Sequence, residues 1–321
     1  MKKTAVVILN WNGKGLMEKF LPSVTDFSPQ ADIWVIDNAS TDDSIKFLQE
    51  NYPETKMVQL DKNYGFAGGY NRGLKNINYE YLVLLNSDVE VTENWLEPLI
   101  FHLENNPKTA VLQPKIKDYK DKKMFEYAGA AGGYLDFFGY PYCDGRLLFT
   151  VEQDKGQYEK EKEIFWASGA CFVIRKNVFD KFKGFDESYF AHQEEIDLCW
   201  RIKNHDYQIK YIPKSTVYHL GGASLDSQNP FKTYLNFRNS LLNLLKNLPS
   251  INLFPIIFSR LLLDGLAGIV FIFQGKPKHT WAVVKAHFGF YKRIPSAWKK
   301  RSKRTTKKYY HRFSVFLKFL D

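Results

Sequence analysis

The stretch of sequence that decides the fold is Tyr81-Leu82-Val83-Leu84-Leu85, an apolar run that stops at Asn86-Ser87-Asp88. A short run without charges, bounded by polar residues, is typical of a strand buried on both faces of a parallel sheet. Ligands of open α/β sheets bind just beyond the carboxyl ends of such strands. Asp88 therefore lies where chemistry is expected, and its carboxylate suits a hard divalent cation that also holds phosphate oxygens. The alternative is a carboxylate that only caps a helix or closes a turn.

Two earlier segments end in the same way. Residues 4–9 run into Asn10, residues 33–36 run into Asp37, and a segment with helical potential lies between them. A strand, a helix and a strand in this order predict a right-handed crossover and parallel strands. Asn10, Asp37 and Asp88 should then lie along one edge of one sheet.

A further predicted strand, residues 56–60, precedes a glycine-rich segment at residues 63–73. Closely spaced glycines that open a helix let backbone N–H groups approach a ligand, and Arg72 is placed to meet a phosphate. The spacing matches neither the dinucleotide-binding motif nor a P-loop. An ordinary tight turn is the alternative.

Four motifs in this order resemble the successive signatures of family 2 glycosyltransferases, especially the bacterial rhamnosyltransferase-like branch. They are Val7 to Gly13, Ile36 to Asp42, Asn63 to Asn71, and Leu85 to Asp88. The resemblance runs from near Val6 to about Asn239, and it implies the GT-A fold. In that fold a Rossmann-like half binds the nucleotide sugar and a second half binds the acceptor. The nucleotide-sugar-binding residues that it implies are Asn10, Asp37, Asn71, Arg72, Asn86, Ser87 and Asp88, with Asp37 on the base or ribose.

The second half of the chain carries acidic residues at the start of a predicted helix. Apolar residues recur at helical spacing after residue 195, so Glu194 and Glu195 fall in the first turn. From the residues alone, they complement the helix dipole while Asp197 pairs with Arg201. The resemblance instead makes Glu195 the general base and Glu194 its acidic neighbour. The family usually carries Asp here, so which glutamate reaches the acceptor hydroxyl stays open.

His219 lies near the end of a last predicted short strand, before a pair of glycines. A hydrogen-bonded structural histidine is one interpretation. The resemblance makes His219 a metal ligand together with Asp88, and it implies Mg²⁺ or Mn²⁺ as the cofactor. Asn86 stands where many relatives carry a first Asp, which predicts a modest affinity for the metal.

Composition adds a basic, apolar C-terminal region. The chain has 321 residues and a net charge of +10, and residues 274–321 alone hold fourteen Lys or Arg and one acidic residue. Residues 251–273 are strongly apolar but are interrupted by Pro255, Arg260 and Asp264. A spanning helix needs about twenty apolar residues with few charges. We therefore expect a helical region that lies in an anionic membrane surface, with a single span as the alternative. Nucleic-acid binding is a further alternative for a basic aromatic tail.

These patterns predict a GT-A catalytic domain at residues 1–240, with a nucleotide-sugar half (1–115) and an acceptor half (116–240). A basic, amphipathic, membrane-associating region follows at residues 241–321. From this division, a chain that ends after Pro249 should stay soluble and bind nucleotide.

The predicted function is inverting transfer of a sugar from a nucleotide-diphospho-sugar to a hydroxyl of a glycan or lipid-linked acceptor in cell-surface polysaccharide synthesis. The enzyme would be peripheral on the inner face of the cell membrane. The three cysteines (Cys143, Cys171 and Cys199) lack metal-site spacing and fit a reducing compartment, and the N-terminal apolar run is too short for a signal peptide. The alternatives are a member that binds nucleotide or glycan without turnover, and an adaptor that acts through its basic tail.

Overall fold

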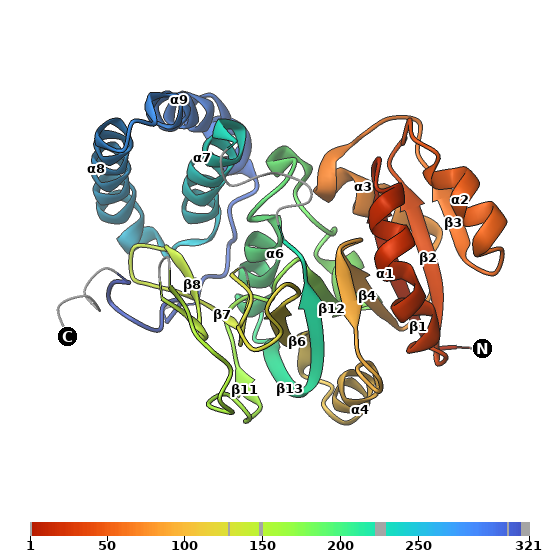
Figure 1. The fold of residues 1–321 in the computed structure, drawn as a ribbon. Coiled ribbons are helices and arrows are strands. Elements are labelled where there is room, and N and C mark those ends of the chain that lie inside the picture. Colours follow the sequence, from red (N-terminus) through yellow and green to blue (C-terminus); the bar gives the residue numbers. More distant parts are fainter. Residues whose placement is uncertain (1, 128, 148–149, 222–228, 307, 316–321) are drawn as a thin grey trace.

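The computed structural model describes residues 2–127, 129–147, 150–221, 229–306 and 308–315. A large mixed sheet forms its centre (Figure 1). The strands of this sheet are β1 (Thr4–Asn10), β2 (Ala31–Asp37), β3 (Lys56–Gln59), β4 (Tyr81–Leu85), β5 (Val89–Val91), β6 (Thr109–Asp118), β11 (Lys162–Glu163), β12 (Cys171–Arg175) and β13 (Gln208–His219). Their order is β11-β13-β6-β12-β4-β1-β2-β3, with β5 paired to β13.

The N-terminal half has the predicted parallel arrangement. β1 pairs in parallel with β2 and β4, and β2 pairs in parallel with β3. Its helices are α1 (Lys14–Asp26), α2 (Ser44–Asn51), α3 (Gly65–Gly73) and α4 (Glu97–Asn105), with a 3₁₀ turn η1 (Leu74–Asn76) after α3. In this register Asn10 lies opposite Asp37, so the polar ends of β1 and β2 meet as expected.

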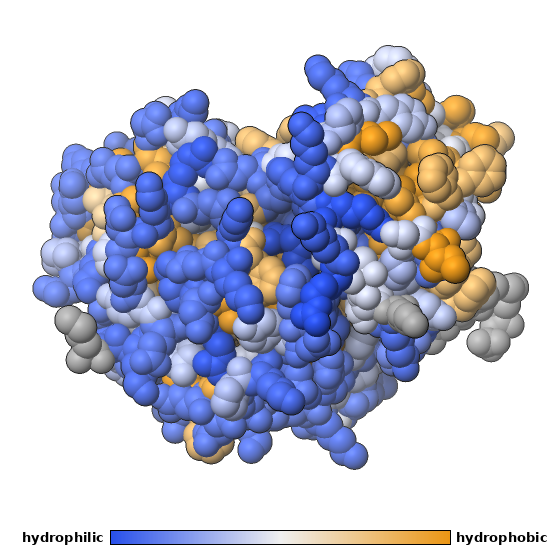
Figure 2. All heavy atoms as spheres, turned by 180° about the vertical axis from the view of Figure 1, so that it is seen from behind, coloured by the Kyte–Doolittle hydropathy of each residue, from blue (hydrophilic) through white to orange (hydrophobic). Residues whose placement is uncertain are grey.

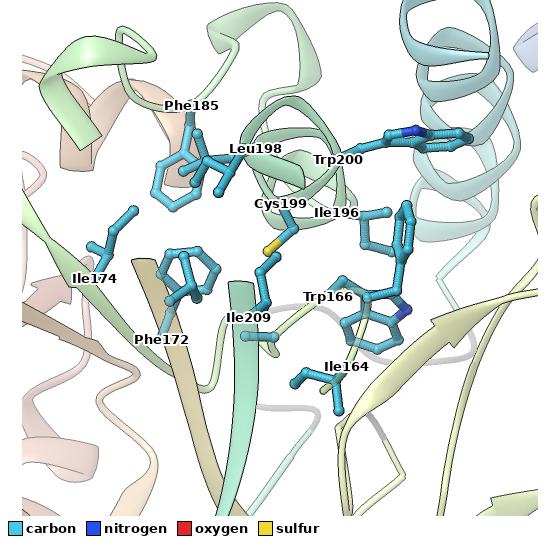
Figure 3. Packing of buried hydrophobic residues seen from close by; sticks show 14 of the residues in the cluster. Ile164, Trp166, Phe172, Ile174, Phe185, Ile196, Leu198, Cys199, Trp200 and Ile209 are labelled. Atoms are coloured by element: carbon cyan, nitrogen blue, oxygen red, sulfur yellow. The ribbon is translucent and has the colours of Figure 1, made fainter. Parts of the chain in front are cut away.

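Both faces of the sheet are buried at β1 and β4, which explains why these strands are apolar without alternation. In β1, Val6 and Ile8 belong to one buried cluster, which also includes residues of α1 and α4. Ala5 and Val7 point the other way, into a second cluster. Part of that second cluster, around Phe172 and Cys199, is shown in Figure 3.

The second half adds antiparallel strands and short helices. β12 pairs antiparallel with β4, and a small separate sheet is built from β7 (Gly133–Leu135), β8 (Pro141–Cys143), β9 (Arg146–Leu147) and β10 (Thr150–Val151). The helices here are α5 (Lys176–Lys181), η2 (Glu187–Tyr189) and α6 (Glu194–Lys203). β13 is longer than the short strand expected before His219, because it continues past an irregularity between Ile212 and Thr216.

Three long helices form the C-terminal part: α7 (Pro230–Asn247), α8 (Ser250–Phe273) and α9 (Pro277–Lys299). They stand together beside the two sheets (Figure 1). After α9 the chain returns to the small sheet, where Arg312 forms a bridge with Asp136. The predicted division at residue 240 falls within α7, and it stays a prediction.

Candidate active site

The polar ends of β1 and β2 form a buried pair. Asn10 Nδ2 donates hydrogen bonds to Asp37 Oδ1 and to Ser40 Oγ, both at 3.0 Å. Asp37 Oδ2 in turn accepts from the backbone N–H of Ser40 at 3.0 Å. Asn10 Oδ1 is buried and has no hydrogen-bond partner among the described residues. An acceptor left unpaired in this way is a place where a ligand donor can bind.

Asn38 ties β2 to the glycine-rich helix, a role that the sequence motif did not reveal. Its Nδ2 donates to Asn63 Oδ1 at 3.0 Å and to the backbone oxygen of Gly65 at 3.1 Å. Gly65 has a φ of 71°, and a Cβ on it would lie 2.6 Å from atoms of Phe190. Glycine is therefore required here, because the start of α3 packs directly on the segment before α6.

Asn71 and Arg72, both predicted to bind the nucleotide sugar, contact the segment before α6. The Asn71 amide donates to the backbone oxygen of Phe185 at 2.8 Å and accepts from its N–H at 3.0 Å. Arg72 forms an ion pair with Glu187 at 2.7 Å and lies 3.8 Å from the ring centre of Tyr64. These contacts connect α3 to the second half of the molecule. The binding of the nucleotide sugar by Asn71 and Arg72 stays a prediction.

Asp88 and His219 are brought together by the pairing of β5 with β13, which sets His219 opposite Val89. His219 Nε2 lies 3.1 Å from Asp88 Oδ1, and His219 Nδ1 lies 3.4 Å from Glu126 Oε1. All three side chains are buried. Burial lowers the pKa of His219, but the interactions with Asp88 and Glu126 outweigh burial and raise that pKa to about 10.

Glu126 was not among the predicted site residues. It lies 93 positions before His219 in the sequence, within a stretch of glycines and aromatic residues that gives no local signal of such a contact. Asn86 and Ser87 lie half-buried between β4 and Asp88, and the Asn86 N–H donates to the backbone oxygen of Ala170 at 3.0 Å.

The donor set at Asp88 and His219 fits a divalent cation. The 3.1 Å between His219 Nε2 and Asp88 Oδ1 is a hydrogen-bonding distance, and a cation would replace the proton that His219 holds there. Asp88 offers a carboxylate oxygen and His219 a ring nitrogen. Among the described residues no cluster of three His, Cys, Asp or Glu side chains has metal-site geometry, so phosphate oxygens and water would complete the shell.

Glu194 and Glu195 begin α6, as predicted, and their surroundings differ. Glu194 is buried, and its Oε2 has no hydrogen-bond partner in the described part of the chain. Burial, followed by the charges of Glu195 and Asp197, raises the pKa of Glu194 well above its usual range. Glu195 is half-buried, and burial raises its pKa to about 7 although backbone N–H groups at the helix start oppose the rise.

The predicted pair of Asp197 with Arg201 is present, with Arg201 Nε at 2.8 Å. Asp197 also contacts Lys246 Nζ at 2.7 Å and accepts from Asn247 at 2.9 Å. Asp197 is fully buried among these partners, so it anchors α6 to α7.

The turn before α6 contacts the start of the glycine-rich helix α3. The backbone oxygen of Phe190 accepts from the N–H groups of Phe66 and Ala67, at 2.8 and 3.4 Å. These residues begin α3, which follows the carboxyl end of β3. The acidic start of α6 therefore lies beside the start of the glycine-rich helix.

Comparisons with known proteins agree with this arrangement. The model of the family described as "Glycosyl transferase family 2" matches residues 5–183. An N-acetylglucosaminyl-diphospho-decaprenol L-rhamnosyltransferase of Mycobacterium tuberculosis is 23% identical over 231 residues, which are 67% of this chain and 75% of that protein.

Two solved structures are similar in fold. The Staphylococcus aureus protein TarS (residues 1–349, with UDP-GlcNAc) has a TM-score of 0.57 and 14% identity, over 94% of this chain and 93% of its own. A mannosyltransferase of Pyrobaculum calidifontis, with GDP-Man and Mn²⁺, has a TM-score of 0.55 and 13% identity, over 93% and 88%. The fold is thus the GT-A-like α/β fold of glycosyltransferase structures. Because the family model covers more than half of the sequence, the chain belongs to glycosyl transferase family 2 and is a transferase.

Proposed function

We propose that this protein is an inverting glycosyltransferase of cell-surface polysaccharide synthesis. It would move a sugar from a nucleotide-diphospho-sugar to a hydroxyl of a lipid-linked or glycan acceptor. The observation that carries the proposal is the carboxyl of Glu195, half-buried at the start of α6 with its pKa raised to about 7. A general base works best when its pKa lies near the working pH.

Glu195 takes the proton of the acceptor hydroxyl as that oxygen attacks the anomeric carbon. One displacement from the face opposite the leaving diphosphate inverts the configuration. Glu194 is less suited to this step, because burial and the charges of Glu195 and Asp197 raise its pKa well above its usual range. Asn10 and Asp37 hold the nucleoside at the ends of β1 and β2.

Asp88 and His219 would hold a divalent cation, Mg²⁺ or Mn²⁺. When bound, the cation supplies positive charge that stabilises the departing nucleoside diphosphate. The chemistry of the two side chains, a carboxylate oxygen and a ring nitrogen brought together at the sheet edge, supports this assignment. The Mn²⁺ in the mannosyltransferase structure supports it further.

The C-terminal helices support attachment to a membrane surface. α8 is long and apolar enough to cross a membrane by length and composition. It has two opposite faces: Arg260 and Asp264 lie on the buried face, where Arg260 donates to the Phe138 oxygen at 3.0 Å and to Ser240 Oγ at 2.9 Å. The exposed apolar residues of α8 and α9, which we call the apolar face, are Ile251, Phe254, Phe258, Leu262, Leu266, Ile269, Val270, Ile272, Phe273, Trp281, Val284, Phe288, Tyr291 and Trp298.

Figure 2 shows hydrophobic residues gathered on one side of the molecule, in the region of these helices. Contiguous apolar surface of this extent is typical of an interaction site, and the basic residues around it suit anionic headgroups. Because Arg260 and Asp264 form an ion pair with each other at 3.5 Å on the buried face, the apolar face alone would enter the lipid. We therefore place the protein peripherally on the inner, cytoplasmic face of the membrane, where a lipid-linked acceptor is present.

A donor screen tests the function. The full chain would be melted with UDP-GlcNAc, GDP-mannose, UDP-galactose and dTDP-rhamnose, each with and without MnCl₂, and release of nucleoside diphosphate would then be measured with membrane extract as the acceptor source. One donor should raise the melting temperature, because it binds the folded state only, and should be consumed. Binding without release would identify a non-catalytic member. No binding by any donor would contradict the proposal.

A further inference from the structure

The turn that precedes Glu194 and Glu195 is held in an unfavourable backbone conformation. Phe190, His192 and Gln193 have φ values of 67°, 66° and 72°. Residues with a Cβ adopt such values at a cost, which the surroundings must offset. Since Gln193 is the last residue before α6, this turn sets the direction in which the helix and its acidic first turn begin.

One asparagine of α7 binds three carbonyl groups in and just before this turn. Asn239 Nδ2 donates to the backbone oxygens of His192 at 2.7 Å, Ala191 at 3.0 Å and Tyr189 at 3.3 Å. The oxygen of the same amide accepts from Arg238 Nε at 2.8 Å, which fixes the orientation of the amide. A side chain without donors would leave the carbonyls of Ala191 and His192 without this partner, whereas the Tyr189 oxygen would keep its hydrogen bond from Arg238 Nη2 at 2.8 Å.

A second asparagine, one helical turn later, binds the end of the turn. Asn243 Nδ2 lies 3.3 Å from the backbone oxygen of Gln193 and 3.2 Å from its Oε1. Asn243 Oδ1 accepts from the hydroxyl of Tyr189 at 2.6 Å. The two amides therefore hold both the beginning and the end of the turn.

The asparagines form a row along α7. Asn239, Asn243 and Asn247 are spaced by four residues, so they share one face of the helix, and all three are buried. Asparagine is a poor helix former, and a buried amide is costly unless it is hydrogen-bonded. The row is explained by what it binds: the turn through Asn239 and Asn243, and Asp197 of α6 through Asn247.

We propose that Asn239 and Asn243 are positioning residues that hold the turn from Phe190 to Gln193 in its left-handed conformation and so direct the Glu195 carboxylate at the acceptor hydroxyl. This inference rests on the proposed function of Glu195. Neither asparagine needs to touch a substrate. Their effect is transmitted through the backbone of the turn, where a displacement of about 1 Å at a reacting group can cost about a hundredfold in rate.

The test compares three variants of the full chain: Asn239→Ala, Asn243→Ala and the control Ser240→Ala. Ser240 is also buried on α7, but it accepts from Arg260 of α8, so its loss removes a buried hydrogen bond without touching the turn. Asn243→Ala removes the two contacts to Gln193 and the hydrogen bond from the Tyr189 hydroxyl, and it keeps the test valid if Asn239→Ala does not fold. Melting temperatures show whether the three variants are equally stable.

The first measurement follows the pH titration of the Glu195 carboxyl by ¹³C NMR, with the signal assigned by its loss in Glu195→Gln. We expect the pKa of about 7 to fall in both asparagine variants, because a loosened turn admits water, and to persist in Ser240→Ala. The second measurement is release of nucleoside diphosphate from the donor that the screen selects. We expect turnover to fall ten- to a hundredfold with the donor KM unchanged, and Ser240→Ala to keep its turnover.

Folded asparagine variants that retain the wild-type titration of Glu195 and the wild-type turnover would overturn the proposal. A loss that Ser240→Ala shares to the same extent would also overturn it, since it would reflect general destabilisation. If the wild-type protein consumes no donor, the proposed function fails by itself, and the NMR titration still decides whether the asparagines position Glu195.

Discussion

At the scale of single residues, the raised pKa of Glu195 predicts how the rate depends on pH. The base must be deprotonated, so we expect kcat/KM to fall about tenfold for each pH unit below about 7.

Glu195→Gln should keep donor binding and lose roughly 10²–10⁴-fold in transfer, because the base is deleted at constant size. Initial rates and donor affinity measure both effects. Glu194→Gln is the control. If Glu194→Gln loses transfer and Glu195→Gln keeps the wild-type rate, Glu194 is the general base.

Glu194 predicts a pH-dependent change in stability. Its folded-state pKa is raised by burial, so the folded protein binds this proton more tightly than the unfolded chain does. That contribution is fully present below the ordinary pKa of a glutamate and is lost as the pH rises through the raised value. Glutamine mimics the neutral form of the side chain. Between pH 5 and pH 8, the free energy of unfolding of Glu194→Gln should therefore rise relative to that of the wild-type protein. Urea unfolding at both pH values measures the difference, and a constant difference would show that Glu194 is not held protonated.

Asp88 predicts a dependence of nucleotide binding on the cation. Asp88→Ala should abolish the gain in nucleotide affinity that Mg²⁺ or Mn²⁺ provides, and His219→Ala should reduce it less, since oxygen ligands dominate for hard cations. Calorimetric titration with and without chelator measures this. Equal affinity in chelator for the wild-type protein would rule out the metal role.

At the scale of elements, α7 depends on the chain that follows it. Arg301 donates to the carbonyl oxygens of Leu245 and Leu248, the Ser302 N–H donates to the Lys246 oxygen at 2.8 Å, and Lys300 contacts Asp186 at 2.6 Å. These contacts cap the end of α7 and the segment before α6. A truncation would therefore remove contacts to α7 and to the segment that precedes the turn and α6.

The sequence suggested that a chain ending after Pro249 would remain soluble, and the structure leads us to expect otherwise. Removing residues 250–321 exposes the side of α7 that packs against α8 and α9, and it deletes the cap at the end of α7. Exposure of each buried apolar side chain there costs about 1.5–3 kcal/mol, a large part of the stability of a domain. We expect this truncated chain to be insoluble or to melt at least about 10 °C lower, as measured by circular dichroism. A truncated chain with the wild-type melting temperature would show that the helices are a separate unit.

At the scale of the whole molecule, the apolar face of α8 and α9 predicts binding to lipid vesicles. Phe254 and Phe258 are 83% and 65% exposed. Replacing both with Ser should weaken binding to anionic vesicles by about 3 kcal/mol, more than a hundredfold, because two apolar side chains no longer enter the lipid. Phe101→Ser on α4, where the side chain is 67% exposed, is the matched control. Sedimentation with vesicles measures binding, and protein that stays in the pellet after a carbonate wash would favour a spanning helix over peripheral attachment.

The sequence by itself determined the strands β1, β2 and β4, the polar residues that end them, and the acidic start of α6. These features are local, because burial on two faces selects continuous apolar runs and a helix needs only its own periodicity. Only the tertiary structure decided that Glu126 joins Asp88 and His219, that Asn71 and Arg72 contact the segment before α6, and that the charges of α8 face inward. The pKa of Glu195 and the left-handed turn beside it depend on the same kind of information. Burial and contact between residues distant in sequence are properties of packing, and no local pattern encodes them.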